Sequence, residues 1–223
     1  YTYYALFEAI SYTITFETNG GEWAEGFEVP TTYKITDEIT LPTRENISKT
    51  GYTFAGWHKE ADLSDEVVLT IPVGTTGAQT FYAAWTPNSY EITLDANGTT
   101  FTDGNDTKVV SVTYETSTGF EVELSDFVGH TLLGWFTEDG VQVADADGNF
   151  VESVEGYTDD QGRWQRADGA TLYANWKLHT YTITFDKNDA LATGEMQPMT
   201  VSYGQSTTLT PNAFFKQGYY FAG

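Results

Sequence analysis

The segment Tyr12-Thr-Ile-Thr-Phe16 recurs along the chain as Tyr90-Glu-Ile-Thr-Leu94 and as Tyr181-Thr-Ile-Thr-Phe185. In the first copy large apolar residues alternate with threonines, which is the pattern of a strand with one buried face. A polar turn follows each copy, and two of these turns contain Asn19-Gly20 and Asn97-Gly98. Because Asn-Gly favours positive backbone dihedrals, the sequence predicts a tight hairpin turn after the opening strand.

Further landmarks follow in the same order. The segment Gly51-Tyr-Thr-Phe-Ala-Gly-Trp57 is matched by Gly129-His-Thr-Leu-Leu-Gly-Trp135 and by Gly218-Tyr-Tyr-Phe-Ala-Gly223. Two aromatic closing segments complete the pattern, Thr80-Phe-Tyr-Ala-Ala-Trp85 and Thr171-Leu-Tyr-Ala-Asn-Trp176. Landmarks that recur in a fixed order indicate tandem repeats.

The phase of these landmarks predicts the domain organisation. We expect residues 1–10 to hold the closing strand of a preceding repeat, because residues 2–7 match the two closing segments. Full repeats are expected at 11–87 and 88–178, and 179–223 is expected to be the first part of a further, truncated repeat. The second repeat is longer, and an inserted hairpin at about 140–169 is the simplest explanation. The alignment also predicts that a Trp follows Gly223 in the parent chain.

Repeat length and connections predict an elongated arrangement. Each unit has about 80–90 residues, which exceeds the usual period of stacked solenoids and allows each unit its own core. The connections at 86–89 and 177–180 are short, and the first contains Pro87. Short connections limit bending, so we expect a rod of neighbouring small modules.

The fold class expected is mainly β (α+β), with at most one short helix in each repeat. The abundant Tyr, Phe, Thr and Val suit a pleated, half-buried surface. A short helix or helical turn is expected at residues 41–49, before Gly51 as its C-terminal stop. The corresponding segments in the other repeats are 125–128 and 211–216.

Composition restricts the classes of partner. The formal net charge is −22, with 32 acidic and 10 basic side chains. Such a surface repels phosphate backbones and anionic lipids, so we do not expect nucleic acid or a membrane surface as a partner. No apolar run approaches the length of a transmembrane helix, so we expect no membrane insertion. The chain has no cysteine, which excludes disulfides and thiol chemistry.

Candidate chemistry is sparse, and we expect no enzyme activity, no catalytic residues, no cofactor and no metal site. The acidic stretch from Asp145 to Asn149 has some features of a calcium loop. Aligning Gly148 with the glycine of an EF-hand places Val143 and Val154 at ligand positions, which excludes that motif. The three histidines, His58, His130 and His179, lack the spacing of metal ligands.

The six tryptophans divide into two groups. Those within the repeat landmarks are predicted to pack in cores or between repeats: Trp57, Trp85, Trp135 and Trp176. Trp23 and Trp164 lie outside the landmarks, in turn-rich segments, and are the candidates for stacking on a sugar ring. We expect each of the two to pack under its own loop, and stacking on a sugar is the rival interpretation.

The quoted landmarks resemble the Listeria–Bacteroides repeat, also described as the internalin B-type B repeat. The match is specific in the opening strand with its Asn-Gly-Gly turn, the Gly-Tyr-Thr-Phe-Ala-Gly-Trp segment and the Leu-Tyr-Ala-x-Trp ending. The resemblance implies tandem β-grasp-like modules on secreted or cell-wall-attached bacterial proteins, where they serve as stalk or adhesive regions. It implies no catalytic residues.

We therefore expect a non-catalytic repeat region of an extracellular bacterial protein, secreted or attached to the cell surface. It would act as a stalk or spacer and as an adhesion or protein-interaction module, with a host or bacterial surface protein or glycan as partner. The alternative is a carbohydrate-binding module that uses Trp23 or Trp164. The ligand-binding residues are unknown at this stage. Open repeat ends also suggest head-to-tail self-association, because unpaired strand edges accept further strands.

Overall fold

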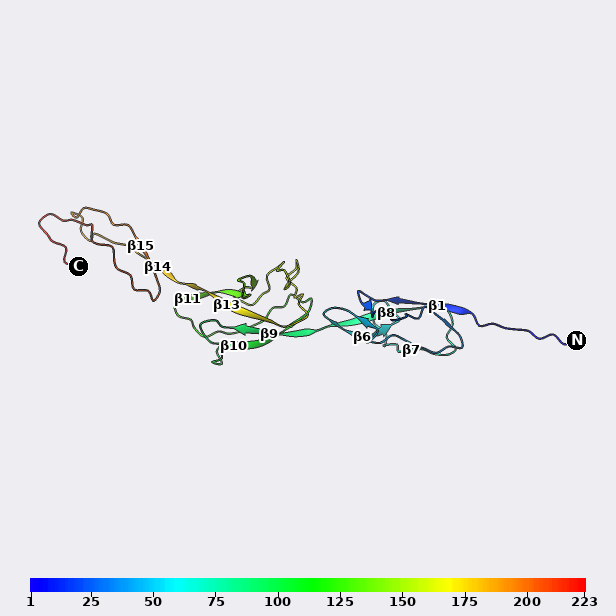
Figure 1. The fold of residues 1–223 in the computed structure, drawn as a ribbon. Coiled ribbons are helices and arrows are strands. Elements are labelled where there is room, and N and C mark those ends of the chain that lie inside the picture. The colour runs from blue at the N-terminus through cyan, green and yellow to red at the C-terminus, as the bar shows by residue number, and fades with distance from the viewer. The chain divides into compact units, whose positions relative to one another are not determined.

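The computed structural model describes all 223 residues as strands, turns and irregular segments, without a helix (Figure 1). The expectation of a mainly β fold is confirmed. The strands are β1 (Ser11–Glu17), β2 (Glu22–Trp23), β3 (Thr32–Lys34), β4 (Ile39–Thr40), β5 (Ile47–Ser48), β6 (Tyr52–His58), β7 (Thr70–Ile71), β8 (Gln79–Pro87), β9 (Ser89–Asp95), β10 (Thr107–Thr113), β11 (His130–Phe136), β12 (Gln142–Ala144), β13 (Ala170–Leu178), β14 (Thr180–Ile183) and β15 (Met199–Ser202).

Contacts group the chain into two compact units. The first consists of Tyr1–Ile92, Ser111–Thr118 and Glu152–Gly169. The second consists of the remaining segments, Thr93–Val110, Gly119–Val151 and Ala170–Gly223.

The first unit is built on a four-stranded sheet with the order β3-β1-β8-β6. The two central strands, β1 and β8, run parallel, with Phe16 opposite Phe81, whereas both outer strands are antiparallel to their neighbours. As the period-two pattern predicts, Ile14 is buried while Thr13 and Thr15 are exposed. The buried face forms one core: Ile14, Tyr33, Leu41, Ile47, Trp57, Ile71, Phe81 and Ala83.

The second sheet has the order β10-β9-β13-β11-β12. In the core of the second unit the Trp135 ring is fully buried. It stacks on Phe101 with ring centroids 6.1 Å apart and meets the edge of Phe120 at 5.7 Å. A two-stranded antiparallel sheet of β14 and β15 follows, with Tyr181 opposite Val201.

Both Gly-Trp strands contain a β-bulge. The register shifts between Phe54 and Gly56 in β6, and between Leu132 and Gly134 in β11. The glycines have φ values of 134° and 139°, which favour glycine. An inserted residue breaks the alternation of faces. As a result the Phe54 and Trp57 rings meet edge to face, with centroids 5.3 Å apart. Without the bulge, alternating side chains would place these two residues on opposite faces of the strand.

The expected helices at 41–49, 125–128 and 211–216 are wrong. In the first segment the backbone N–H of Thr43 donates to Asn46 Oδ1 at 2.8 Å, and that of Asn46 donates to the Thr43 carbonyl at 2.8 Å. Such local side-chain bonds compete with helix formation. The chain then enters β5, where Ile47 pairs with Trp23. The other two segments are also non-helical. The segment 125–128 follows Leu124, which bridges Phe101, and the segment 211–216 contains Phe215, which bridges Thr193.

The segment 140–169 contains two separate local structures. In the second unit β12 pairs with β11, and the chain reverses so that Phe150 bridges Ala144. In the first unit Thr158 bridges Trp164, and the Trp164 backbone exchanges hydrogen bonds with Glu115 and Thr116 at 2.8 and 3.0 Å.

Candidate functional site

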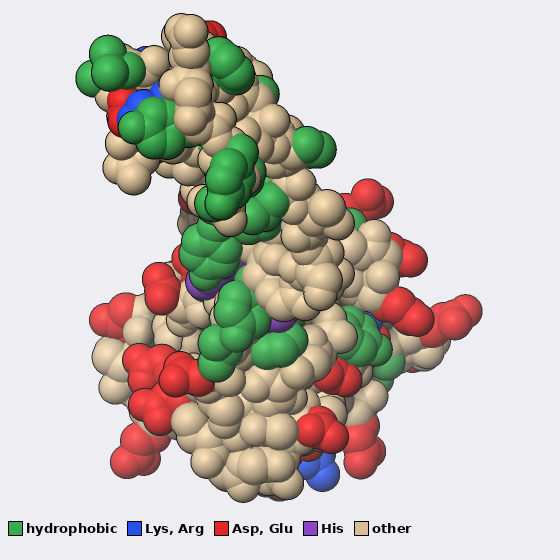
Figure 2. All heavy atoms as spheres, turned by 90° about the vertical axis from the view of Figure 1, so that its left-hand side faces the viewer, with side chains coloured by type: hydrophobic (Ala, Val, Ile, Leu, Met, Phe, Trp, Pro, Cys, Tyr) green, Lys and Arg blue, Asp and Glu red, His purple; other side chains and the backbone are tan.

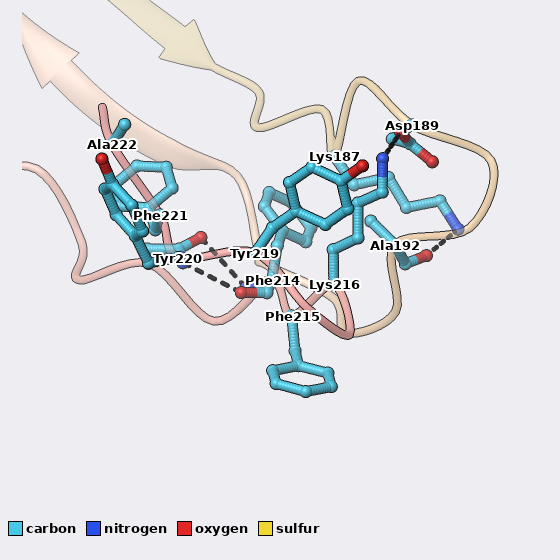
Figure 3. A pocket seen from close by; sticks show the side chains of 11 residues that line it. Lys187, Asp189, Ala192, Phe214, Phe215, Lys216, Tyr219, Tyr220, Phe221 and Ala222 are labelled. Carbon is cyan, nitrogen blue, oxygen red and sulfur yellow. Dashed lines mark hydrogen bonds and ion pairs between the residues drawn. The ribbon is translucent and has the colours of Figure 1, made fainter.

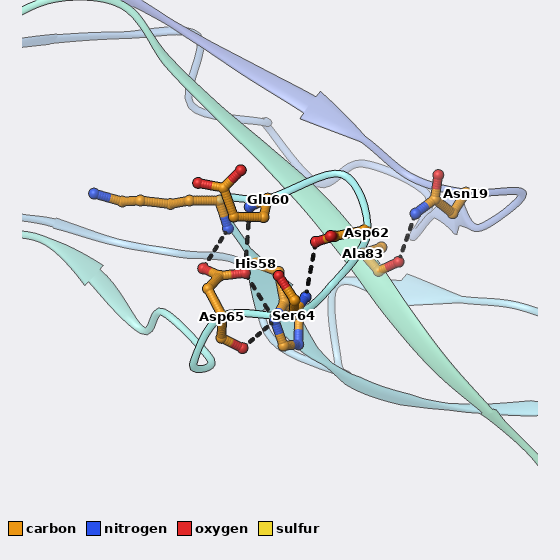
Figure 4. Close-up of polar contacts among 8 residues, drawn as sticks. Asn19, His58, Glu60, Asp62, Ser64, Asp65 and Ala83 are labelled. Carbon is orange, nitrogen blue, oxygen red and sulfur yellow. Dashed lines mark hydrogen bonds and ion pairs between the residues drawn. The ribbon is translucent and has the colours of Figure 1, made fainter.

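The first turn and the closing strand are joined by two reciprocal hydrogen bonds, which we call the turn–strand clamp. Asn19 Nδ2 donates to the Ala83 carbonyl at 2.8 Å (Figure 4). Trp85 Nε1 donates in the opposite direction, to the Thr18 carbonyl at 2.9 Å. The turn supports this geometry because Asn19 and Gly20 both have positive φ, 50° and 86°, as Asn-Gly favours.

The clamp recurs in the second unit with the same atoms. Asn97 Nδ2 donates to the Ala174 carbonyl at 2.8 Å, and Trp176 Nε1 donates to the Ala96 carbonyl at 2.9 Å. In the C-terminal segment Asn188 also has positive φ, 53°, but its side-chain amide makes no hydrogen bond. The sequence signal was present, because Asn lies at the same offset in each turn and Ala lies two residues before each closing Trp. The Asn-Gly pattern predicts only the turn, whereas the structure gives the Asn side chain a second role as the donor to the closing strand.

A second repeated arrangement, the repeat junction, lies where one closing strand leads into the next opening strand. The Asn88 N–H donates to the Gly51 carbonyl at 2.8 Å, and its carbonyl accepts from the Tyr114 N–H at 2.9 Å. The Tyr114 ring covers Gly51 so closely that an added Cβ would lie 2.3 Å from the ring. Only glycine fits there, since its φ is also positive at 79°.

The same junction recurs in the second unit. The His179 N–H donates to the Gly129 carbonyl at 2.7 Å, and the His179 carbonyl accepts from the Tyr203 N–H at 2.9 Å. A Cβ on Gly129, whose φ is 78°, would lie 2.0 Å from the Tyr203 ring. The matching Gly218 has φ 80° but no heavy atom within 4 Å of such a Cβ. Two complete junctions and one open position therefore share one backbone geometry.

A polar pair accompanies the first junction. The Tyr52 hydroxyl donates to the Glu115 carboxylate, and the Tyr52 ring meets Tyr114 edge to face at 5.6 Å. Desolvation, with a smaller contribution from the hydrogen bond to Glu115, raises the pKa of Tyr52 to about 12. The tyrosine is thus held as a neutral donor.

Several carboxylates are committed to local backbone structure. Asp65 accepts from the Lys59 N–H at 2.9 Å and the Glu60 N–H at 3.2 Å, and lies beside His58 Nδ1 (Figure 4). The Lys59 N–H contributes most to holding the pKa of Asp65 below its usual value. The acidic loop at Asp145 is similar, because its Oδ1 accepts from the Asp147 and Asn149 N–H groups, both at 2.9 Å. These carboxylates close turns.

The two tryptophans proposed for sugar stacking lie against protein. Trp164 is 0% exposed, and its Nε1 donates to the Arg166 carbonyl at 2.9 Å. The expected packing is therefore confirmed for Trp164, and the rival interpretation of an exposed platform is wrong. The cause is the long-range pairing of its backbone with residues 115–116, which local sequence does not reveal. Trp23 is half-buried and its ring contacts Phe16, Phe27 and Trp57, with centroids 5.6 to 5.8 Å apart.

The C-terminal segment has a polar pair beside exposed aromatic rings (Figure 3). Lys216 Nζ forms an ion pair with Asp189 and lies 4.2 Å from the centroid of the Tyr219 ring. Lys187 Nζ donates to the Ala192 carbonyl at 2.9 Å. Phe215 points away from the other labelled side chains, and it is 63% exposed.

Two clamps and two junctions of the same design define a tandem-repeat β protein. The family model of the Listeria-Bacteroides repeat domain matches residues 12–84 and 181–223, which is more than half of the chain. The chain therefore belongs to the Listeria-Bacteroides repeat domain family, and the expected resemblance is confirmed.

Two relatives come from Evansella cellulosilytica. Over its full length the chain is 28% identical to a protein named "Putative Gly-rich membrane protein" and 27% identical to one named "Putative membrane protein". It spans 23% of the first relative and 30% of the second. No solved structure matches the chain. The fold includes no helix of the length and apolar character needed to cross a bilayer.

Proposed function

We propose that this chain is a non-catalytic stalk or spacer within a bacterial protein that is secreted or attached to the cell surface. The observation that carries the proposal is the repeat junction, present at Gly51 and again at Gly129. At this junction two backbone hydrogen bonds fix the connecting residue, and a tyrosine ring packs against the glycine. Such a connection restricts bending between one repeat and the next. Repeats connected in this way would extend as a rod, which is the arrangement a spacer needs.

The repeat itself fits a β-grasp-like module that lacks the helix. Its first and last strands, β1 and β8, form a central parallel pair with antiparallel strands on either side. The clamp ties these strands together from the turn side, through Asn19 and Trp85. A stalk module benefits from such long-range cross-links, because they connect segments far apart in sequence.

The surface charge supports the same role. A formal net charge of −22 favours the solubility of a crowded extracellular chain and opposes its non-specific association. Two relatives are named as putative membrane proteins, which supports a location at the cell surface. Membership of the repeat family supports the same location. We further propose that the chain contributes to adhesion through surface-protein contacts, for which the segment 140–169 is the candidate, because an insertion on a fixed scaffold can change without disturbing the core. The burial of Trp164 weighs against the carbohydrate-binding alternative.

The stalk proposal is tested by measuring stiffness within one molecule. Because the chain has no cysteine, Glu38 and Asp139, both exposed, can be replaced by a labelled cysteine pair. Pulsed electron spin resonance should give a narrow distribution of the distance between the two labels when Gly51 is unchanged. Gly51→Ala should broaden it, because the new Cβ displaces Tyr114.

The matched control is Gly218→Ala. It introduces the same strain at φ 80° but meets no neighbour, so the distribution should stay narrow. A broad distribution of the label distance in the chain without a glycine substitution, as expected of a flexible tether, would contradict the proposal. So would equal broadening by Gly51→Ala and Gly218→Ala.

A further inference from the structure

The second repeat has a groove beside its turn–strand clamp, formed by the end of β11, the turn that follows it and β13. Its volume is about 360 Å³, which lies within the range of about 300–1,000 Å³ that is usual for ligand pockets. Phe136 and Tyr173, which lie opposite each other in the β11–β13 pair, both line the groove. Both aromatic side chains are only half-buried, so part of each remains open to a ligand.

The polar side chains of the groove are mainly hydrogen-bond acceptors. Glu138, in the turn after β11, is exposed and forms no ion pair. Asn97 donates its Nδ2 to the Ala174 carbonyl in the clamp, which leaves its Oδ1 as an acceptor. The exposed Asn175 adds a second side-chain amide. No Lys, Arg or His lines the groove, so its chemistry suits a cation.

The turn that carries Glu138 is fixed by three hydrogen bonds. The Thr137 N–H donates to the Val141 carbonyl at 2.8 Å, and the Gly140 N–H donates to the Thr137 carbonyl at 3.0 Å. The Val141 N–H donates to Thr137 Oγ1 at 3.1 Å. Because this backbone is already ordered, a ligand that pairs with Glu138 has less conformational entropy to remove.

The surroundings of the groove favour a positively charged partner. Between Lys108 and Arg163 the sequence contains no Lys or Arg, whereas Asp and Glu recur throughout this stretch. Figure 2 shows acidic side chains over the face in view, with few basic ones among them. A surface dominated by one sign of charge attracts a partner of the opposite sign and raises the rate of encounter.

The first repeat differs at the matching positions. His58, the counterpart of Phe136, is 9% exposed, and its Nδ1 lies 2.9 Å from the Asp65 carbonyl oxygen. Lys59 lies where the second repeat has Thr137. An ammonium group at this position repels a cationic ligand. We therefore expect the site in the second repeat and not in the first.

We propose that the groove of the second repeat binds an arginine side chain of a partner protein. A guanidinium group is planar, so it stacks on an aromatic ring such as Phe136 or Tyr173. It also donates two parallel hydrogen bonds to a carboxylate, here Glu138. Lysine would bind more weakly, because its ammonium group has no planar face to stack. This inference rests on the proposed contribution to adhesion and is independent of the stalk role.

The first test titrates the peptide acetyl-Gly-Ser-Arg-Ser-Gly-amide into the isotope-labelled full chain. About 0.15 M salt screens general attraction between exposed charges. The amide NMR signals of residues 136–140 and 173–175 should shift and saturate. A peptide with citrulline in place of arginine keeps the shape but has no charge, and should bind about fivefold or more weakly. Equal affinity of the two peptides, or no saturable shift at these residues up to about 10 mM peptide, would overturn the proposal.

Two neighbouring carboxylates provide a matched pair of variants. Glu138→Gln removes the carboxylate of the groove and should weaken binding of the arginine peptide about two- to fivefold, as expected for one partly exposed ion pair. Asp139→Asn removes the same charge from an exposed residue that does not line the groove, so the affinity should stay nearly the same. Equal weakening by both variants would indicate general attraction to an acidic surface and overturn the site.

The aromatic wall is tested by Phe136→Leu and by Tyr173→Leu, each of which keeps an apolar side chain and removes a ring. At least one of them should weaken binding about two- to fivefold, as expected for a lost cation–π contact. Unchanged affinity in both variants would overturn the stacking.

Thr137→Lys introduces the cation of the first repeat and should abolish binding of the arginine peptide, whereas retained binding would overturn the proposed position of the guanidinium. The NMR signals also separate this proposal from the adhesion role. Shifts confined to residues 141–169 would overturn the groove as the site and retain adhesion through that segment. The stalk role depends only on the distance between the spin labels, so no result with the peptide bears on it.

Discussion

The turn–strand clamp makes a quantitative prediction for Asn19→Gly. Glycine keeps the positive φ of the turn without strain, so the substitution removes mainly the bond from Asn19 Nδ2 to the Ala83 carbonyl. Ala83 is buried, and losing one partner of a buried acceptor costs about 1–2 kcal/mol. Because the bond joins the turn to β8, opening of that strand should become easier by this amount.

Amide hydrogen exchange measures this opening residue by residue. A loss of about 1–2 kcal/mol corresponds to about 5–30-fold faster exchange of the protected amides in β8. Asn188→Gly is the matched control, because it carries the same entropic cost of glycine without a clamp to break. Asn97→Gly should act on β13 instead, through the lost bond to the Ala174 carbonyl.

The reasoning would be refuted by a specific result. If exchange in β8 were the same in Asn19→Gly and Asn188→Gly, the bond at 2.8 Å would contribute nothing to the stability of the strand. If Asn19→Gly accelerated exchange in β13 as much as in β8, the effect would be global and the clamp would not be a local cross-link.

Four further outcomes are expected. Trp57→Phe should lower the free energy of unfolding in urea by about 1–3 kcal/mol more than Trp135→Phe does. The reason is that Trp57 Nε1 donates to the Pro42 carbonyl at 2.7 Å, whereas the buried Trp135 Nε1 has no hydrogen-bond partner. Equal losses in the two variants would contradict this. Asp65 has a lowered pKa, so its contribution to stability is present above pH 3.8 and is lost as the pH falls through its folded pKa. Carboxyl NMR titration should give a midpoint below 3.8, and a higher midpoint would be inconsistent with the backbone bonds to Asp65. Tyr52 should titrate at about 12 by ultraviolet absorbance, and Glu115→Gln should bring the pKa closer to 10 without reaching it, because desolvation remains. The pH-dependent stability from Tyr52 is fully present below pH 10 and is lost as the pH rises through about 12. Finally, Trp164→Ala should destabilise the first unit by about 3–5 kcal/mol, as removal of a fully buried indole does, and a neutral effect in urea unfolding would contradict its burial.

Local pattern predicted the parts of the fold that depend on local chemistry. The alternation around Ile14 correctly predicted which face of the strand is buried. The Asn19-Gly20 pair correctly predicted a turn in which both residues have positive φ. The turn does not join a two-stranded hairpin, however. The strand after it, β2, pairs with β5, while β1 pairs with β3 and β8. Pairing partners depend on the whole chain, and one repeat alone contains several strands of similar pattern.

The bulge in β6 and the absence of a helix before Gly51 both depend on pairing with other strands, which local sequence does not reveal. Nothing local to Ala55 marks it as the extra residue of β6, because a bulge is defined by the opposing strand. The segment before Gly51 has residues that tolerate a helix, but a short helix is costly to nucleate. Asn46 and Thr43 bond to each other's backbone or side chain instead, and Ile47 gains a strand partner.

The clamp and the junction share a property that bears on how the repeat can vary. Their acceptors are main-chain carbonyls of Thr18, Ala83 and Gly51, so the side chains at the first two positions are not chemically required. The required groups are one amide, one indole and one glycine in each repeat. Most surface side chains can then change while the cross-links persist, which is consistent with 28% identity over the full chain. A partner-specific surface would accordingly be sought in segments such as 140–169, whose residues do not form the clamps or the junctions.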